Sequence, residues 1–303
     1  MQEIPDNAVR HKSIIEDFLS QHLKNGRFRG AVIGLSGGVD SAVVAALARN
    51  VLPREKIRIF FLPERDTSPE SKEDAEILSE HLGLELLTFD LSAALAALDI
   101  YKNPAARVVK KGGINRLLYK FSSWLEGEDV FSRGFGPKPS GVINTATSFY
   151  RSKHRMRMTC LFYQAEYLGF AVLGGLNRSE FLTGFFVPHG DDAAHLAPLL
   201  PLYKTEVFHL ANNLELPQKF LDKPPSPDLI PGLDDEFILG MEYELLDRVL
   251  WAIEAGCEIG EIAEKLAIEA KKVAALQSLV NKIKMPAVPF YPREIRELPC
   301  YEN

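Results

Sequence analysis

The sequence contains few cysteines, and their spacing suggests neither a disulfide framework nor a zinc site. Only Cys160, Cys257 and Cys300 occur among 303 residues, and no two of them form a Cys-x-x-Cys pair. Small disulfide-rich secreted domains and zinc-binding modules depend on closely spaced pairs, so both classes are excluded. The cysteine usage predicts a reduced, cytoplasmic protein.

Long apolar runs and an excess of positive charge are also missing. No apolar stretch approaches the roughly 20 residues that a membrane-spanning helix needs, and the N-terminus lacks the apolar core of a signal peptide. Lysine and arginine total 35 against 41 for aspartate and glutamate, which gives a net charge of −6. Proteins whose main partner is nucleic acid use net positive surface to bind phosphates. The sequence therefore predicts neither a membrane nor a nucleic-acid partner.

Short apolar runs alternate with amphipathic stretches along the chain. The apolar runs are typical of buried parallel strands and span 30–35, 56–64, 84–92 and 170–176. Helical periodicity covers 8–24, 42–52, 68–83, 155–169, 203–214, about 235–254 and about 258–284. Strands separated by helices predict a Rossmann-like α/β fold, with a parallel sheet between layers of helices. Without a linker or an internal repeat, we expect a single domain over 1–303 whose C-terminal part is helical from about 235.

Residues 102–150 do not fit this alternation. They contain several basic residues followed by the turn-rich segment GFGPKPSG. Two interpretations stay open: an insertion on the solvated surface, or a lid over an active site, since long loops in compact domains are often functional.

The segment Ser36-Gly-Gly-Val-Asp-Ser41 carries the strongest chemical information. It lies between a predicted buried strand and a predicted helix, which is where α/β folds bind ligands. Two glycines let the backbone approach an anion closely, and the amides at a helix start point toward it. Asp40 would then stand beside a phosphate, where a carboxylate is well suited to hold Mg²⁺. An ordinary glycine-rich turn explains the glycines but not the ordered serines and aspartate.

This segment is not a Walker A loop, because the lysine of that motif is missing. It resembles the pyrophosphate loop of the N-type ATP pyrophosphatases. Further segments are similar, in order and spacing, to ammonia-dependent NAD synthetases. These segments are KHRMRM (153–158), GGLNRSE (174–180), HGDDAAHLAPLLPLYKTEV (189–207), LDKPPSPDLIPGLDDEFILG (221–240) and LVNKIKMPAVP (279–289). The resemblance covers roughly 8–100 and 151–290.

The resemblance implies roles for individual residues. Those implied to bind ATP are Gly34, Leu35, Ser36, Gly37, Gly38, Val39, Asp40, Ser41, Gly175, Lys204 and Ser226. It assigns Mg²⁺ to Asp40 and Glu180, and catalysis to Asp40 and Lys204. Residues implied to bind the acceptor substrate are Arg155, Asp191, His195 and Lys282. The alternative for Lys204, Glu180 and Arg155 is a solvated charge on a helix, and for Asp191 a turn residue.

The sequence departs from the family mainly on the acceptor side. Pro188 replaces a lysine and His195 an aspartate that contact deamido-NAD, while Asn281 replaces the histidine of a His-Lys pair. Gly175 stands where the family has a threonine that contacts ATP. The residues implied to bind ATP and Mg²⁺ thus match the family better than the residues implied to bind the acceptor.

The expected activity is the ATP-dependent amidation of deamido-NAD by ammonia through an acyl-adenylate, with release of AMP and pyrophosphate. A related enzyme that uses another small carboxylate is the alternative suggested by the departures, and a non-catalytic binding protein is disfavoured by Asp40, Glu180 and Lys204. The sequence shows no extra domain of the size that a glutaminase needs, so we expect free ammonia, or ammonia from a separate partner, as the nitrogen donor. The resemblance also implies a homodimer.

Overall fold

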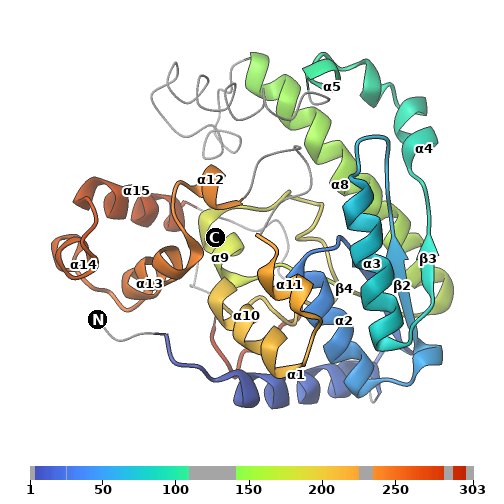
Figure 1. The fold of residues 1–303 in the computed structure, drawn as a ribbon, viewed down its shortest axis with the longest axis horizontal. Helices are drawn as coiled ribbons and strands as arrows, with labels where there is room; N and C mark the ends of the chain where they lie inside the picture. The colour runs from blue at the N-terminus through green and yellow to red at the C-terminus, as the bar shows by residue number, and fades with distance from the viewer. Residues whose placement is uncertain (1–3, 25, 109–140, 225–234, 283–288, 298–303) are drawn as a thin grey trace.

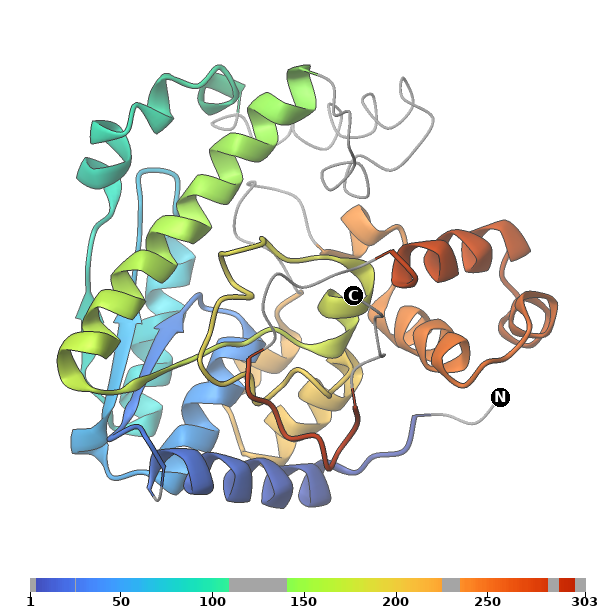
Figure 2. The same cartoon turned by 180° about the vertical axis from the view of Figure 1, so that it is seen from behind.

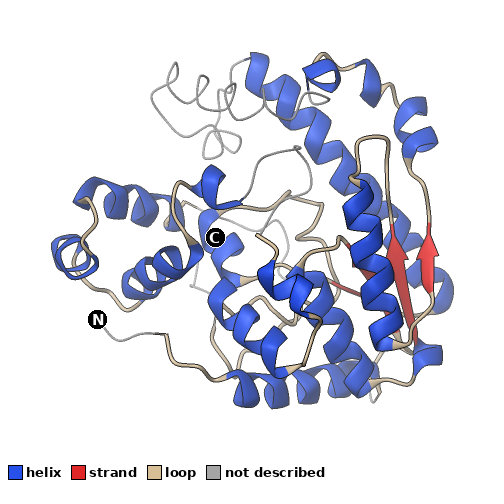
Figure 3. Ribbon diagram, in the orientation of Figure 1, coloured by secondary structure: helices blue, strands red, loops and turns tan. Residues whose placement is uncertain are grey.

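A computed structural model describes residues 4–24, 26–108, 141–224, 235–282 and 289–297. Its four parallel strands lie in the order β3–β2–β1–β4, and helices surround them (Figure 3). They are β1 (Ala31–Leu35), β2 (Ile57–Phe61), β3 (Leu86–Thr88) and β4 (Ala171–Leu173). Single-residue bridges from Leu173 to Leu196 and from Leu196 to Phe290 continue the sheet beyond β4. The parallel sheet confirms the predicted fold class.

Helices cover both faces of the sheet (Figures 1 and 2). One layer contains α1 (Ala8–Leu23), α2 (Val39–Val51), α3 (Pro69–Leu82) and α10 (Lys204–Asn213). The other contains α4 (Ser92–Ala97) and the long α8 (Gly141–Leu168). Strand side chains alternate between the layers: Ile33 and Ile59 pack with the first, whereas Val32 and Phe60 pack with the second. This period of two is what a strand buried on both faces requires.

A helical lobe lies beside the sheet domain (Figure 1). Its helices are α12 (Asp235–Leu239), α13 (Tyr243–Glu254), α14 (Ile259–Leu266) and α15 (Ala270–Val280). The short helices α5 (Ala105–Val108), α9 (Arg178–Thr183) and α11 (Gln218–Asp222), with the 3-10 turns Arg54–Lys56 and Ile100–Lys102, complete the described elements. Apolar side chains of α9 and α13 share one core cluster, which joins the lobe to the domain. Among the described residues, no helix is both long and apolar enough to span a bilayer.

The elements differ from the sequence predictions in extent. Each of the two predicted C-terminal helices is split in two, the first at Gly240 and the second at Ala267, and both residues have positive φ. The helix predicted from 155 begins at Gly141, so 141–150 of the expected insertion belong to α8. Residues 109–140 of that segment lie outside the described residues.

Candidate active site

The loop after β1 is shaped by glycine and closed by serine hydroxyls. Gly37 has a φ of +80°, a left-handed conformation that favours glycine. The Ser41 hydroxyl donates to the carbonyl of Gly38 at 3.0 Å, and its oxygen accepts from the amide of Ser36 at 3.3 Å. The loop is therefore held at its two ends, and α2 begins directly after Gly38. This geometry matches an anion-binding helix start.

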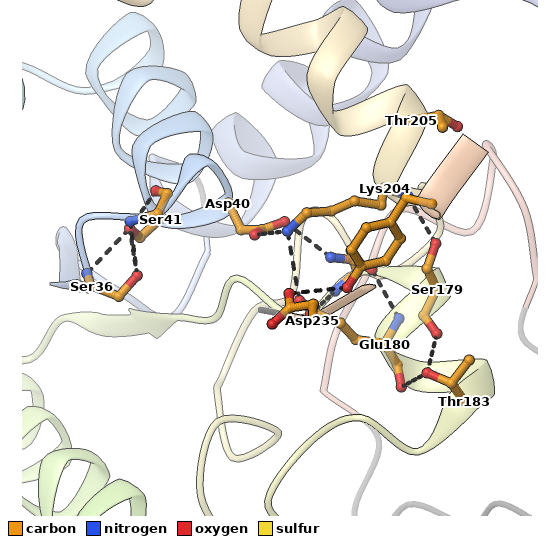
Figure 4. A network of polar contacts seen from close by, with 12 residues as sticks. Ser36, Asp40, Ser41, Ser179, Glu180, Thr183, Lys204, Thr205 and Asp235 are labelled. Atoms are coloured by element: carbon orange, nitrogen blue, oxygen red, sulfur yellow. Dashed lines mark hydrogen bonds and ion pairs between the residues drawn. The ribbon is translucent and has the colours of Figure 1, made fainter. Parts of the chain in front are cut away.

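Two carboxylates converge on one buried lysine at the end of this loop (Figure 4). Asp40 lies in the first turn of α2, Glu180 in α9, and Lys204 begins α10. The Lys204 ammonium forms an ion pair with Asp40 and lies 3.8 Å from Oε1 of Glu180. The structure thus brings together the three residues implied in catalysis and metal binding, and the 2% exposure of Lys204 does not fit a surface lysine.

Asn177 connects the two carboxylates. Its Nδ2 donates to Oδ1 of Asp40 at 3.0 Å, and its Oδ1 accepts from the amide of Glu180 at 3.0 Å. The Glu180 carboxylate in turn accepts from the Asn177 amide at 3.2 Å, which completes a capping box at the start of α9. Asn177 is fully buried and orients both acids.

The two carboxylates of the cluster favour a cation between them. Burial, together with the negative charge of Asp40, raises the pKa of Glu180 well above its ordinary value. Burial alone would lower the pKa of Lys204, but the carboxylates of Asp40, Glu180 and Asp235 outweigh it and raise that pKa. Lys204 thus stays charged and supplies the cation that the acids need.

The donor set fits Mg²⁺. Asp40 and Glu180 offer hard oxygen ligands around a position that already favours a cation, and Mg²⁺ is commonly held by one or two carboxylates with water and phosphate oxygens. Within the described ranges, metal-ligating side chains do not gather in groups of three or more. Mg²⁺ usually takes its remaining ligands from water and from substrate phosphates.

Hydrogen bonds to Ser179 of α9 and Asp247 of α13 hold the backbone at the start of α10. The Ser179 oxygen accepts from the Lys204 amide at 2.9 Å, and the Ser179 hydroxyl donates to Asp247. Asp247 also accepts from the amide of Thr205 at 2.8 Å. The start of α10 is therefore fixed by a fully buried carboxylate.

We expect Asp247 to make stability depend on pH. Burial raises the pKa of Asp247 from 3.8 to about 6. Between these values the folded protein holds a proton that the unfolded chain has released, so the stabilisation is complete below the lower pKa and is lost as the pH rises toward 6. Relative to Asp247→Asn, wild type should lose about 2–3 kcal/mol of unfolding free energy across this window.

Chemical denaturation at several pH values measures this difference. Asp17→Asn, on the exposed face of α1, is the matched control. A difference between wild type and Asp247→Asn that does not change with pH would show that Asp247 does not titrate in this way.

Two residues implied in acceptor binding lie together in a second group beside the first. Nε and Nη2 of Arg155, on α8, donate to the carbonyl of Pro188 at 3.1 and 3.0 Å. Asp191 accepts from the Val187 amide at 2.6 Å. Burial raises the pKa of Asp191 to about 7, although the side chain is 38% exposed and solvent tempers the shift.

Gly174 and Gly175, which follow β4, lie between the two groups and contact both. A Cβ built on Gly174 would lie 3.8 Å from the carbonyl oxygen of Asp191, and one built on Gly175 would lie 3.5 Å from the Cβ of Asp40. The phosphate loop and the turn around Asp191 are therefore neighbours, close enough to hold two parts of one ligand assembly.

The structure does not bring His195 to either group. Its ring packs between Phe28 and Phe162, at 4.9 Å from each ring centre, and Nδ1 accepts from the Val172 amide at 3.0 Å. Burial lowers the pKa of His195, so the ring is neutral. Lys282 is exposed just after α15, and Ser226 lies outside the described residues.

Three residues of the site were not singled out from the sequence. The capping role of Asn177 has a local signal, because Asn-x-x-Glu before a helix is a capping-box pattern. Asp235, which accepts from the Tyr243 hydroxyl at 3.1 Å, and Asp247 come from the helical lobe. Their position beside Lys204 depends on tertiary packing that no local pattern indicates.

Comparison of the sequence with known proteins finds the same family by two routes. A family model described as NAD synthase matches residues 12–121 and 139–285. The NH(3)-dependent NAD(+) synthetase of Thermotoga maritima is 38% identical over 269 residues, which is 88% of this chain and 94% of that protein. The enzyme of the same name from Coprothermobacter proteolyticus is 35% identical over 286 residues, 92% of this chain and 95% of that protein.

Solved structures share the fold over nearly the whole chain. An NMN synthetase from Francisella tularensis superposes with a TM-score of 0.65 at 26% identity, covering 98% of this chain and 99% of that one. An NH3-dependent NAD synthetase from Campylobacter jejuni gives 0.64 at 24% identity, with coverage of 93% and 99%. The second likeness concerns the fold alone.

Proposed function

Because the chain belongs to the NAD synthase family, we propose that it amidates deamido-NAD to NAD with ammonia and ATP. The observation that carries this proposal is the cluster at the end of the glycine loop, in which the buried Lys204 faces the partly exposed acids Asp40 and Glu180. The cluster has an ammonium group and two carboxylates, which we assign to Mg²⁺, beside the helix start that we assign to the phosphates of ATP. The chain covers most of the length of ammonia-dependent relatives, which favours free ammonia as the nitrogen donor.

The proposed reaction has two steps. A carboxylate oxygen of deamido-NAD attacks the α-phosphorus of ATP, the bond from that phosphorus to the bridging oxygen breaks, and pyrophosphate leaves. Ammonia then attacks the acyl carbon, the carbon–oxygen bond to AMP breaks, and one proton is released as the amide forms.

The residues of this chain act mainly on the charge of the phosphates. The amides after Gly37 and the hydroxyls of Ser36 and Ser41 bind phosphate oxygens at the start of α2. Lys204 stabilises the negative charge that gathers as pyrophosphate leaves. Asp40 and Glu180 would hold Mg²⁺, which supplies further positive charge to the phosphates when it is bound. Asn177 keeps the two acids in place.

Arg155 and Asp191 are the residues we assign to the acceptor. Arg155 already donates to the backbone carbonyl of Pro188, and Pro188 is the residue that replaces a lysine of the family. A proline has no side-chain donor, so the turn offers the acceptor one charge-assisted hydrogen bond fewer. The roles of His195, Lys282 and Ser226 stay predictions, and His195 would need to leave its aromatic contacts to reach a ligand.

Pro188, His195 and Asn281 differ from the family's residues on the acceptor side. A smaller carboxylate should therefore be compared with deamido-NAD as the acceptor. The structural likeness to an NMN synthetase makes nicotinate mononucleotide the relevant competitor. The decisive experiment compares kcat/KM for the two carboxylates with ATP, Mg²⁺ and ammonium. A preference for deamido-NAD supports the proposal, and a preference for the mononucleotide assigns the chain to the smaller acceptor.

We also propose that the protein is a cytoplasmic homodimer that pairs through the outer face of α8. Tyr163 and Tyr167 lie one turn apart on this helix and are 66% and 79% exposed, beside an open hollow of about 440 Å³ that Arg155 also lines. Exposed aromatic side chains on one face are typical of an interface.

Light scattering should give twice the chain mass of 33.8 kDa. Changing both tyrosines to glutamate should give the single mass, because two charges on each chain would be buried at a symmetric contact. A monomeric wild type at working concentration would contradict the proposal.

A further inference from the structure

A second polar cluster lies on the other side of the phosphate loop, where α3 and α11 approach it. Asp74 of α3 is fully buried. Its Oδ1 lies 2.6 Å from Nζ of Lys219, and its Oδ2 lies 2.6 Å from Nζ of Lys223. One carboxylate therefore pairs with two ammonium groups.

This cluster is in direct contact with the loop. A Cβ built on Gly37 would lie 3.1 Å from the carbonyl oxygen of Ser71 and 3.3 Å from the Cβ of Asp74, so α3 packs against the loop backbone. Nζ of Lys223 also donates to the carbonyl of Gly37 at 3.4 Å. The ammonium of Lys223 thus stands beside the backbone that is shaped to receive phosphate.

The two lysines are not equivalent. Lys219 is on α11, and its pKa is raised by its hydrogen bond to Asp74 and by the nearby charges of Glu73 and Glu70, all on α3. Lys223 follows α11, has a side chain 23% exposed, and is the one of the two whose described contacts include the loop. Lys219 therefore has acidic neighbours of its own, whereas the ammonium of Lys223 is directed to the loop.

We propose that Lys223 is a further phosphate-binding residue, which turns from the Gly37 carbonyl to an oxygen of the pyrophosphate portion of ATP. A lysine suits this movement because its ammonium is a point charge on a flexible four-carbon stem. Asp74 is the positioning residue that holds the ammonium at the loop before the nucleotide arrives. This inference rests on the proposed function, since it needs ATP in the loop.

Calorimetry on the full-length protein tests it, with Mg²⁺ and three probes: α,β-methylene-ATP, pyrophosphate and AMP. Lys223→Met should weaken binding of the ATP analogue and of pyrophosphate by about 10- to 100-fold, the usual effect of losing one charge-assisted hydrogen bond. AMP has no pyrophosphate portion, so its affinity should stay within about 2-fold, which also shows that the variant is folded.

Lys219→Met is the matched control, because it removes the same charge from the same carboxylate without touching the loop. We expect all three affinities to stay within about 3-fold, since a partly exposed ion pair contributes little. Lys223→Arg keeps the charge and should recover most of the lost affinity.

The outcomes separate the inference from the proposed function. A wild type that does not bind the ATP analogue would overturn both. Tight binding of the analogue by wild type and equally by Lys223→Met would overturn the inference alone. A loss of the same size in Lys219→Met, or an equal loss for AMP, would also overturn it, because the effect would then be one of general charge or of loop structure.

Discussion

Asp40→Asn is expected to lower kcat for NAD formation by about 10³-fold while the fold survives. The substitution keeps the shape of the side chain and removes the charge that pairs with Lys204 and would hold Mg²⁺. Loss of that charge also removes the repulsion that helps to raise the pKa of Glu180. Glu180 can then ionise more readily and take over as the partner of Lys204.

Steady-state kinetics over a range of Mg²⁺ concentrations, with a thermal melt of the same preparation, measures both parts of this prediction. Asp17→Asn makes the same chemical change on an exposed face of α1 and should leave kcat within about 2-fold. Near-normal turnover of Asp40→Asn at saturating Mg²⁺ would remove Asp40 from the site.

Lys204→Met is expected to have an effect of similar size on turnover, about 10²- to 10³-fold, and a larger one on stability. The lysine is 2% exposed and lies between Asp40 and Glu180. Its removal leaves two partly exposed acids without a counter-ion, and the cost should approach the roughly 3–5 kcal/mol that is typical of a broken buried pair. Mg²⁺ should restore part of the melting temperature, because a dication between the acids replaces the missing charge.

A double-mutant cycle separates this electrostatic explanation from loss of packing. Asp40→Asn should destabilise wild type but stabilise the Lys204→Met background, since there it removes one of two uncompensated acids. Additive losses in the double variant would mean that Lys204 acts through packing rather than through its charge.

The sequence predicted local features well where the signal is local. The α3 helix begins after Ser68 and ends at Gly83, as its cap residues indicated, because a serine acceptor and a left-handed glycine specify helix ends by themselves. The break at Ala267 was missed, since a non-glycine residue with a φ of +53° gives no warning in the sequence. The third strand was predicted too long because its partner β2 pairs with it only over Ile59–Phe61.

The residues of the site likewise differ in how far the sequence alone could identify them. The loop around Asp40 could be identified because its glycines, serines and carboxylate are contiguous. The supporting residues Asn177, Asp247 and Asp74 lie in other elements, α13 and α3 among them, and reach the loop and Lys204 only through the packing of the sheet and the lobe. His195 was placed by the order of residues in a resembling segment, whereas its ring packs between Phe28 and Phe162.

The central claim is that the loop, Lys204 and the two acids activate a carboxylate by adenylation. The most direct test uses deamido-NAD labelled with ¹⁸O in the nicotinate carboxylate, together with ATP, Mg²⁺ and ammonium, and mass spectrometry of the AMP that is released. An acyl-adenylate requires that one carboxylate oxygen leaves with the phosphate, so NAD and AMP should form in equal amounts and the AMP should carry ¹⁸O. Unlabelled AMP, or ADP and inorganic phosphate in its place, would contradict the proposed mechanism.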